Sequence, residues 1–216
     1  MKMPAARSRT ATPKPRAYNQ SARAEAAEAT GKRIVDAFLA RLMAQWFDEI
    51  TLDQIAADAG TTVQTIVRRF GSKEGLLEAG IAQFGAQVNA KRECEPGDVD
   101  AMVSALFKDY EESGDAVIRL LALEPRHSTL KPVMDYGRAE HRRWVEAAMV
   151  PYLAQQSTEA RRRMSDALVM ATDVYAWQLA RRDMGRSIPA SKALIKATVK
   201  GIISEFAKLK SSGDGQ

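Results

Sequence analysis

The sequence holds little of what a disulfide-stabilised secreted domain or a metalloprotein needs. Its 216 residues include one cysteine, Cys94, so no disulfide can form within the chain. The two histidines, His127 and His141, do not combine with that thiol into a zinc-binding group of known spacing. We therefore expect no metal site, no cofactor and a location in the reducing cytoplasm.

Long apolar segments are missing as well. No run approaches the ~20 residues that cross a bilayer, so we expect no membrane partner. The basic N-terminus is not followed by the apolar segment of a secretory signal. The composition, 45% hydrophobic and 27% charged, is that of one or two ordinary globular domains with a buried core.

The common enzyme motifs are absent. We find no nucleophile elbow, phosphate-binding loop, dinucleotide fingerprint or His-Glu-x-x-His zinc motif. The segment Gly71-Ser-Lys-Glu-Gly75 resembles fragments of a phosphate-binding loop, but its order and spacing are wrong. We expect no catalytic residues and no enzyme activity.

Acidic residues are absent from the first 23 positions, which contain six of the 32 basic residues. Residues 24–216, here called the body, have 26 basic and 27 acidic residues and a net charge of −1. The net charge of +5 for the whole chain therefore comes from residues 1–23, here called the basic arm. Because residues 1–23 are rich in Ala, Pro, Ser and Thr, we expect them to be disordered. Phosphate or minor-groove contacts are one interpretation, and a solvated tail that aids solubility is the other. The candidate contacts are Arg7, Arg9, Lys14 and Arg16.

Helical periodicity dominates the rest of the chain. Ile34, Phe38, Leu42 and Trp46 recur every four residues, which indicates one buried helix face. Strands are not expected, because no alternating run rich in Val, Ile and Thr occurs. The pattern predicts about nine helices, at residues 24–46, 51–60, 61 or 62 to 70, 72–93, 98–113, 115–123, 130–155, 158–184, and 190 or 191 to 210. Pro151 marks a kink or break, and residues 211–216 form a polar tail.

The segment 51–70 has the pattern of a helix-turn-helix. Thr51 is a good N-cap, Ala56 allows close approach of the next helix, and Gly60 permits the sharp turn. Ile55, Ile66 and Phe70 fall on the inner faces of the two helices. The outer face of the second helix then presents polar side chains suited to the major groove of DNA, at Thr62, Val63, Gln64, Thr65, Arg68 and Arg69.

Residues from about 30 to 80 resemble the DNA-binding domain of the tetracycline-repressor (TetR) family. The resemblance rests on Ile34-Val-Asp-Ala-Phe38, on Phe47 to Gly60, and on Thr65-Ile-Val-Arg-Arg-Phe-Gly-Ser-Lys-Glu-Gly-Leu-Leu77. It implies an all-α fold with a three-helix DNA-binding domain at residues 24–80. It also implies a helical dimerisation and effector-binding domain at residues 81–210.

Three positions depart from the family pattern. Trp46 stands where a glycine is usual, and Thr61 where an apolar residue is usual. Val67 replaces a tyrosine whose hydroxyl bonds a DNA phosphate, so Arg68, Arg69 or the arm would have to supply that attraction.

The resemblance also implies individual roles. Thr51 and Lys73, each at the start of a helix, are expected to meet phosphates, and Thr65 to touch the DNA backbone. Gln64 can bond the edge of an adenine at two points. Arg68 can do the same to guanine, hold a phosphate instead, or remain a solvated charge.

The resemblance implies that the C-terminal body forms a homodimer through its last two long helices. The last helix supports this expectation, because Leu194, Ile195, Val199, Ile202, Ile203 and Phe206 form a stripe too wide for burial on one side. The family also implies a cavity for a small apolar or amphipathic effector. Its candidate lining residues are Tyr110, Met134, His141, Trp144, Met170, Tyr175 and Trp177, any of which can equally be a core residue. The setting Glu140-His-Arg-Arg favours surface exposure of His141.

The function predicted from the sequence is a transcriptional regulator, with repression the favoured direction. It would bind a palindromic double-stranded operator as a homodimer and be released by an effector. A nucleoid-type protein that binds DNA by charge alone is the alternative. It would need a more basic body and no reading helix.

Overall fold

The computed structural model describes residues 16–213, and every regular element in that range is helical. The predicted all-α class is therefore confirmed. Arg7, Arg9 and Lys14 lie outside the described residues. No helix in the described part of the chain combines the length and the apolar character needed to span a membrane.

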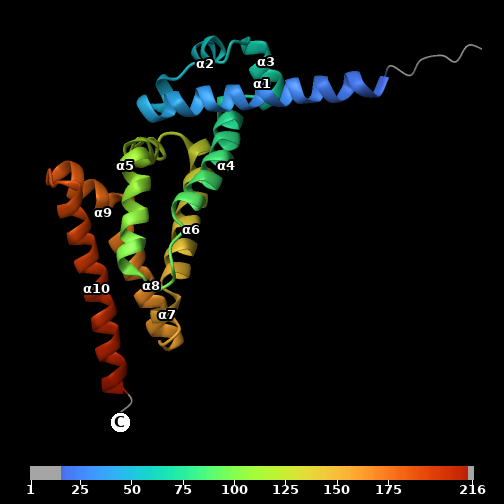
Figure 1. Ribbon diagram of the computed structural model, residues 1–216. Helices are drawn as coiled ribbons and strands as arrows, with labels where there is room; N and C mark the ends of the chain where they lie inside the picture. Colours follow the sequence, from blue (N-terminus) through green and yellow to red (C-terminus); the bar gives the residue numbers. More distant parts are fainter. Residues whose placement is uncertain (1–15, 214–216) are drawn as a thin grey trace, which may run out of the picture.

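The first helix, α1 (Arg16–Ala44), begins eight residues before the predicted start. Residues 16–23, which were assigned to a disordered arm, are therefore helical. The reason is local, because six alanines between residues 17 and 29 favour a helix and the last proline of the arm is Pro15. The N-terminal half of α1 projects beyond the other helices (Figure 1).

Three helices complete the N-terminal domain after a 3₁₀ turn, η1 (Phe47–Glu49). They are α2 (Leu52–Asp58), α3 (Val63–Phe70) and α4 (Lys73–Lys91). The turns between them use Gly60 and Gly71, whose φ values of 61° and 78° are in the region that glycine tolerates best. Ile34, Phe38 and Ile66 are fully buried in their shared core. The helix-turn-helix expected from the sequence is present at the expected residues.

The next helix, α5 (Val99–Leu123), is continuous, and the predicted break between residues 113 and 115 is wrong. Gly114 lies inside the helix. A Cβ at this position would come within 2.6 Å of the Trp177 ring, so the glycine serves close packing rather than a turn. Helix α5 is therefore one continuous element of 25 residues.

Two of the three remaining predicted helices are divided into shorter elements, and the last is longer than expected. The elements after α5 are η2 (Ser128–Leu130), α6 (Lys131–Ala148), α7 (Val150–Leu153), α8 (Thr158–Thr172), α9 (Val174–Gln178), the π-helical turn η3 (Leu179–Asp183) and α10 (Ile188–Gly213). The helix expected over residues 130–155 is interrupted at Met149, two residues before Pro151. Residues 158–184 were expected as one helix, but Asp173 is extended and its carboxylate accepts a hydrogen bond from the Tyr175 N–H at 3.0 Å. Helix α10 continues two residues past Ser211, the expected start of the tail.

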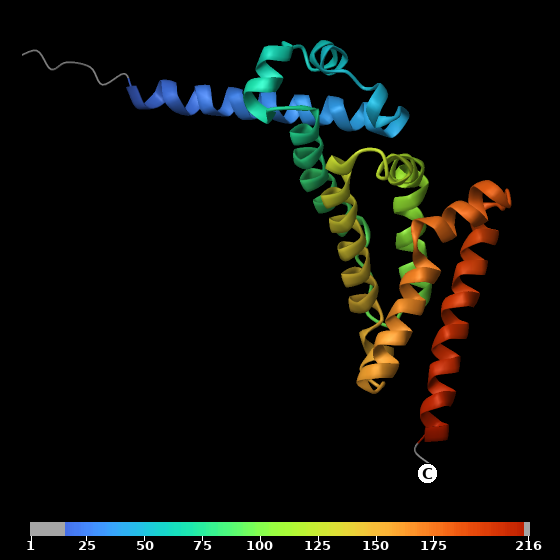
Figure 2. The same cartoon turned by 180° about the vertical axis from the view of Figure 1, so that it is seen from behind.

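The helices form two regions joined by α4. Helices α1–α3 lie across one end of the molecule, α4–α8 descend from them, and α10 runs along the outside next to α8 and α5 (Figures 1 and 2). The N-terminal core extends into the C-terminal body through Leu120, Leu130 and Val133. The expected domain boundary at residue 80 therefore falls within the continuous helix α4, which connects the two regions.

Candidate nucleic-acid interface and C-terminal cavity

The outer face of α3 carries two long polar side chains that the protein itself does not use. Gln64 and Arg68 are exposed, and neither has a hydrogen-bond or ion-pair partner within residues 16–213. Val67 on the same face is 43% exposed. Val63 and Thr65 are half-buried, and Val63 packs against the N-terminal core. Among the described residues, the polar side chains of α3 without a partner inside the protein are therefore those of Gln64 and Arg68.

Two threonines begin the helices of the helix-turn-helix: Thr51, as the sequence predicts, and Thr62, one of the two starts that the sequence left open. The Thr51 hydroxyl accepts from the Gln54 N–H at 3.3 Å, while the Gln54 amide oxygen accepts from the Thr51 N–H at 2.9 Å. This reciprocal capping box fixes the first turn of α2. Thr62 caps α3 by accepting from the Thr65 N–H at 3.2 Å. The Thr-x-x-Gln spacing was the signal for the capping box, and the sequence reasoning did not use it.

Arg69 contacts α1 instead of pointing away from the domain. Its Nη1 donates to the Ala27 carbonyl at 2.8 Å, and its guanidinium lies against Gly31, where a Cβ would come within 2.3 Å. Gly31 thus lets the Arg69 side chain cross the surface of α1. Arg69 orients the projecting helix relative to α3, and its assignment to DNA stays a prediction.

Lys73 is directed towards the protein as well. Its ammonium donates to the carbonyls of Phe47 and Ile50 at 2.8 and 2.9 Å and lies 4.5 Å from the centre of the Phe47 ring. Burial lowers the pKa of Lys73. These contacts stabilise the turn before α2, and they leave one of the three N–H groups for the phosphate that the sequence assigned to it.

An ion pair that the sequence reasoning missed joins α1 to α2. Arg41 binds Asp58 through Nε and Nη2 at 2.5 and 2.9 Å. Arg33 adds a longer contact of 3.5 Å to the Ala59 carbonyl, next to the turn. These partners are 17 and 26 residues apart, and no local pattern in the sequence marks them.

The absence of a glycine before Phe47 is explained by the backbone. Trp46 adopts φ −70° and ψ 142°, an extended conformation open to any residue. The indole is 40% exposed. This departure from the family pattern therefore leaves the turn unstrained.

A cavity of about 220 Å³ lies between the N-terminal domain and the C-terminal body. Its walls come from α1, α4, α5, α6 and the segment 173–175. Leu39, Leu42 and Met43 bring α1 into direct contact with this space. A molecule in the cavity would thus touch the first helix of the helix-turn-helix domain.

Five of the seven residues predicted to line a pocket do line this cavity, namely Tyr110, Met134, His141, Trp144 and Tyr175. Met170 lies elsewhere, because its side chain on α8 is 75% exposed. Trp177 is buried against Gly114, and its Nε1 donates to Glu111 at 2.9 Å. The sequence could not separate these cases, since aromatic and methionine residues occur at helical spacing on every wall.

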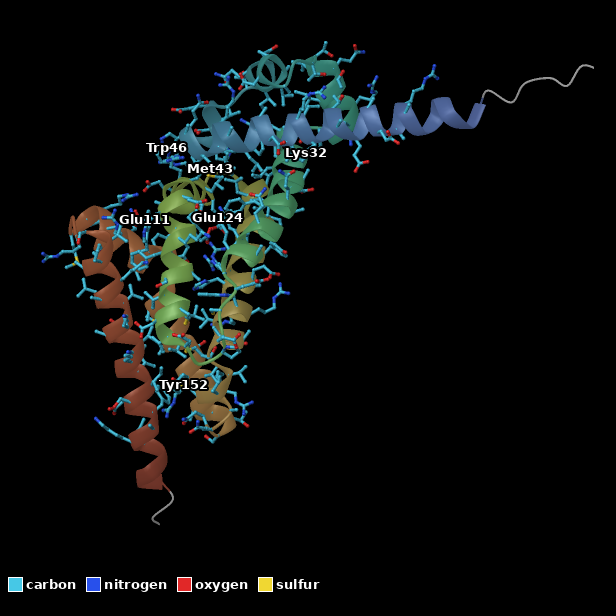
Figure 3. All side chains as sticks on the ribbon, viewed as in Figure 1. Lys32, Met43, Trp46, Glu111, Glu124 and Tyr152 are labelled. Carbon is cyan, nitrogen blue, oxygen red and sulfur yellow. The ribbon has the colours of Figure 1, made fainter. Side chains whose placement is uncertain are left out.

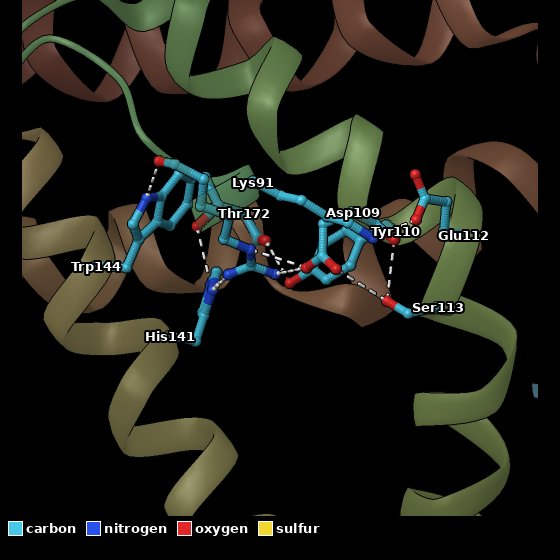
Figure 4. A network of polar contacts seen from close by, with 9 residues as sticks. Lys91, Asp109, Tyr110, Glu112, Ser113, His141, Trp144 and Thr172 are labelled. Carbon is cyan, nitrogen blue, oxygen red and sulfur yellow. Dashed lines mark hydrogen bonds and ion pairs between the residues drawn. The ribbon is translucent and has the colours of Figure 1, made fainter. Parts of the chain in front are cut away.

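A buried ionic network forms one end of the cavity (Figure 4). Arg92 donates from Nε and Nη2 to Asp109 Oδ2 at 2.8 and 2.5 Å, and its Nη1 lies 3.2 Å from His141 Nδ1. Thr172 Oγ1 lies 3.2 Å from His141 Nε2 and donates to the Leu168 carbonyl at 2.8 Å. Ser113 donates to the second Asp109 oxygen at 3.1 Å. The network ties α4, α5, α6 and α8 together.

The expectation that His141 is exposed is wrong, since it is 9% exposed. An arginine can only donate, so His141 Nδ1 accepts from Arg92 and Nε2 carries the proton. Burial and the nearby Arg92 charge lower the pKa of His141 from 6.5 to about 3. The imidazole is therefore neutral at physiological pH.

Arg119 joins the C-terminal body to the end of α1. From α5 its Nη2 donates to the carbonyls of Leu42 and Met43 at 3.1 and 2.8 Å, which satisfies the open C-terminal turn of α1. Figure 3 shows Met43 and Trp46 at this end of α1, beside the upper end of α5. The contact lies next to the cavity wall formed by Leu42 and Met43.

Apolar side chains are exposed along the last helices. They include Met170 on α8, Tyr175 on α9, Leu179 and Met184 near η3, and Leu194 on α10, each at least 44% exposed. Ile195 and Val199 of α10 are buried, so this helix has apolar residues on an inner and an outer face. Groups of exposed apolar residues are typical of protein–protein contacts.

Comparison with known proteins agrees with this geometry. Residues 34–79 match the family model described as bacterial regulatory proteins, tetR family. The chain is 31% identical over 102 residues to YvkB of Bacillus subtilis strain 168, an uncharacterised HTH-type transcriptional regulator. That alignment covers 47% of this chain and 49% of YvkB, so it spans about half of each protein.

Two solved structures share the fold. A tetR-family transcriptional regulator from Streptomyces coelicolor superposes with a TM-score of 0.64, at 16% identity, over 86% of this chain and 82% of that one. A protein described as a transcriptional regulator, from Pseudomonas aeruginosa PAO1, superposes with a TM-score of 0.63, also at 16% identity, over 81% and 90%. The helix-turn-helix at residues 51–70 lies within the segment that matches the family model. Residues 34–79 are therefore similar to the helix-turn-helix segment of the tetR family of bacterial regulatory proteins, and the fold resembles those of the two solved regulators.

Proposed function

We propose that this protein is a cytoplasmic repressor that binds a palindromic or near-palindromic operator as a homodimer. In this proposal α3 lies in the major groove, where Gln64 and Arg68 contact base edges. The observation that carries the proposal is the exposure of these two side chains, without internal partners, on the outer face of α3. Catalysis has no part in it.

The second half of the proposed assembly is another copy of this chain. The exposed apolar residues of α8, α9 and α10 support it, because a two-fold contact would remove them from water. Two copies of α3 related by such an axis would read half-sites about one DNA turn, ~34 Å, apart or somewhat more. The operator would then have the same symmetry as the protein.

Release by a small effector is the proposed regulation. The cavity supports it, because α1 forms part of its wall and Arg119 binds the end of α1 beside it. The dimer would have conformations that differ in the spacing of the two α3 helices. A ligand that binds one of these conformations more tightly shifts the protein towards it. Operator affinity would fall by the ratio of the two ligand affinities.

Binding by charge alone is the competing function. It would be favoured by a basic body, whereas residues 24–216 carry 26 basic and 27 acidic residues, a net charge of −1. A gel-shift assay distinguishes the two functions. We expect the operator complex to survive an excess of non-specific duplex and to be abolished by unlabelled operator. Equal competition by both duplexes would contradict sequence-specific reading.

The basic arm is proposed as an auxiliary phosphate or minor-groove contact, and Thr51, Thr62, Thr65 and the remaining Lys73 N–H as phosphate contacts. Deleting residues 1–15 removes four basic residues and leaves α1 whole. The dependence of log affinity on log salt is expected to flatten by up to about 0.9 for each DNA phosphate that the arm neutralises. An unchanged slope would assign the arm to solubility.

A further inference from the structure

The charged residues that line the cavity are matched by partners within the protein. Arg92 is paired with Asp109, and both side chains are less than a tenth exposed. Arg138 binds Glu124 and Asp135, Glu140 binds Arg143, and the Asp173 carboxylate caps α9. An anionic ligand would therefore meet no unpaired cation among the described lining residues, and a cationic ligand would meet only the Asp173 carboxylate, which already accepts the Tyr175 N–H. Either ion would lose most of its hydration without a full set of new partners.

The hydrogen-bonding groups at the polar end are also engaged with one another. The proton of His141 is directed to Thr172, whose own hydroxyl donates to Leu168. The Tyr110 hydroxyl donates to the Thr172 carbonyl at 3.2 Å. The Arg92 guanidinium lies 5.0 and 4.9 Å from the centres of the Tyr110 and Trp144 rings. This arginine is held by a carboxylate, an imidazole and two aromatic rings, so it is not a free anchor for a carboxylate ligand.

The rest of the wall is apolar and aromatic. Phe84 on α4, Tyr110 on α5, and Tyr136 and Trp144 on α6 supply rings on several sides, and aliphatic residues of α1 and α5 fill the spaces between them. A dry cavity of about 150 Å³ suffices for benzene. The volume here, about 220 Å³, therefore suits a slightly larger ring system.

We propose that the cavity binds an uncharged aromatic molecule of one or two rings with few polar atoms. This proposal rests on the effector release proposed above and specifies its chemistry. Aromatic stacking and removal of apolar surface from water would supply the affinity. The ligand would touch Leu39 and Leu42 of α1, which links occupancy of the cavity to the helix that supports α3.

The test uses three naphthalene probes of matched shape and different charge, namely 2-naphthylmethanol, 2-naphthoate and 2-naphthylmethylammonium. Calorimetric titration of the full chain without DNA measures each dissociation constant. We expect the neutral alcohol to bind at least tenfold more tightly than either ion. Tighter binding of an ion, or no binding of any probe, would overturn the proposal.

A pair of variants on one helix locates the binding. Ala116 is buried and lines the cavity, whereas Ala122 on the same helix is exposed. We expect Ala116→Leu to weaken the alcohol at least tenfold and Ala122→Leu to leave it unchanged. Equal affinities of two folded variants, judged by thermal unfolding, would place the probe elsewhere and overturn the assignment. Gel shifts of the same proteins report operator binding separately, so failure of the ligand proposal is distinguishable from failure of the DNA proposal.

Discussion

Gln64 is the residue on which base reading can be tested most cleanly. It is exposed, it has no internal partner within residues 16–213, and its amide can bond both N6 and N7 of adenine. We expect Gln64→Ala to relax the preference at one position of each half-site by ~1–3 kcal/mol, while the fold is unchanged. Affinities for a set of operators substituted at single positions measure this preference.

The matched control is Gln87→Ala, an exposed glutamine of α4 beyond the helix-turn-helix. It should leave the preference at every position intact. If Gln64→Ala weakened all duplexes by the same factor, Gln64 would be a backbone contact and not a base contact.

His141 gives the folded state a dependence on pH. Its pKa is lowered from 6.5 to about 3, so below pH 6.5 the unfolded chain takes up a proton that the folded chain does not. The free energy of unfolding therefore falls as the pH falls from 6.5 towards 3, by up to about 1.4 kcal/mol per pH unit from this group. Above pH 6.5 this contribution is constant, since the imidazole is neutral in both states.

Denaturant titrations at pH 7 and pH 5 of the wild type and His141→Gln test this prediction. The wild type should lose more stability than the variant over this interval. Parallel decreases would show that His141 is accessible to protons in the folded protein.

Residue roles could be predicted where their partners are close in sequence. Thr51 was identified as a cap, and the start of the next helix was narrowed to residue 61 or 62, because the N–H groups that Thr51 and Thr62 satisfy lie three residues away. Arg69 and Lys73 were assigned to DNA, yet they contact carbonyls 42 and 26 residues away. Single-sequence reasoning has no access to contacts that only the packed helices create.

At the scale of elements, Gly114 determines how α5 meets α9. A Cβ there would lie 2.6 Å from Trp177 Cζ3, and this ring is 1% exposed and cannot move freely. We expect Gly114→Ala to lower the free energy of unfolding by about 1–3 kcal/mol, the usual cost of overpacking. Chemical denaturation measures the change.

Gly137→Ala is the control, because a Cβ at this mid-helix position of α6 would meet no atom within 4 Å. Here alanine should stabilise the protein by about 0.4–1 kcal/mol through helix propensity and a less flexible unfolded chain. A stabilising effect at both positions would mean that α5 and α9 are not as closely packed as described.

These glycines also explain which helices could be predicted. Gly60 and Gly71 end helices as expected, because they follow an apolar helical pattern and precede a capping residue. Gly114 resembles them in sequence, but it is needed for contact with Trp177, 63 positions later. The break at Asp173 was missed because a mid-helix aspartate and an N-cap aspartate look alike until packing selects one.

At the scale of the whole molecule, the outer face of α10 is the proposed contact between two copies. Leu194 is 44% exposed on this face. We expect Leu194→Glu to shift the protein from dimer to monomer in sedimentation velocity, because a two-fold contact would bury the charge twice without a partner. Operator affinity should fall with it, since one half-site alone supplies less binding energy.

Val150→Glu is the control at a similarly exposed apolar position, 51%, at the start of α7. It should remain dimeric and keep its operator affinity. An unchanged oligomeric state in Leu194→Glu would exclude this face of α10 from the interface.

The general plan of the molecule was predictable because the family motif identifies the helix-turn-helix and helical periodicity covers the rest. The relation between the two regions was not, because it depends on α4 continuing across residue 80 and on Arg119 of α5 binding the end of α1. The cavity arises from this relation, which is why its α1 wall had no signal in the sequence. The sequence did identify aromatic residues that line the cavity. The same set of candidates, however, also contained Met170 and Trp177, which do not line it.

Selection of bound duplexes from a random pool by the wild-type protein tests the central claim most directly. We expect the recovered sites to share an inverted repeat with half-site centres about 34 Å apart or somewhat more, and Gln64→Ala to lose preference within each half. A recovered pool without a common sequence, or one with a single unrepeated element, would contradict reading of DNA by a symmetric pair of α3 helices.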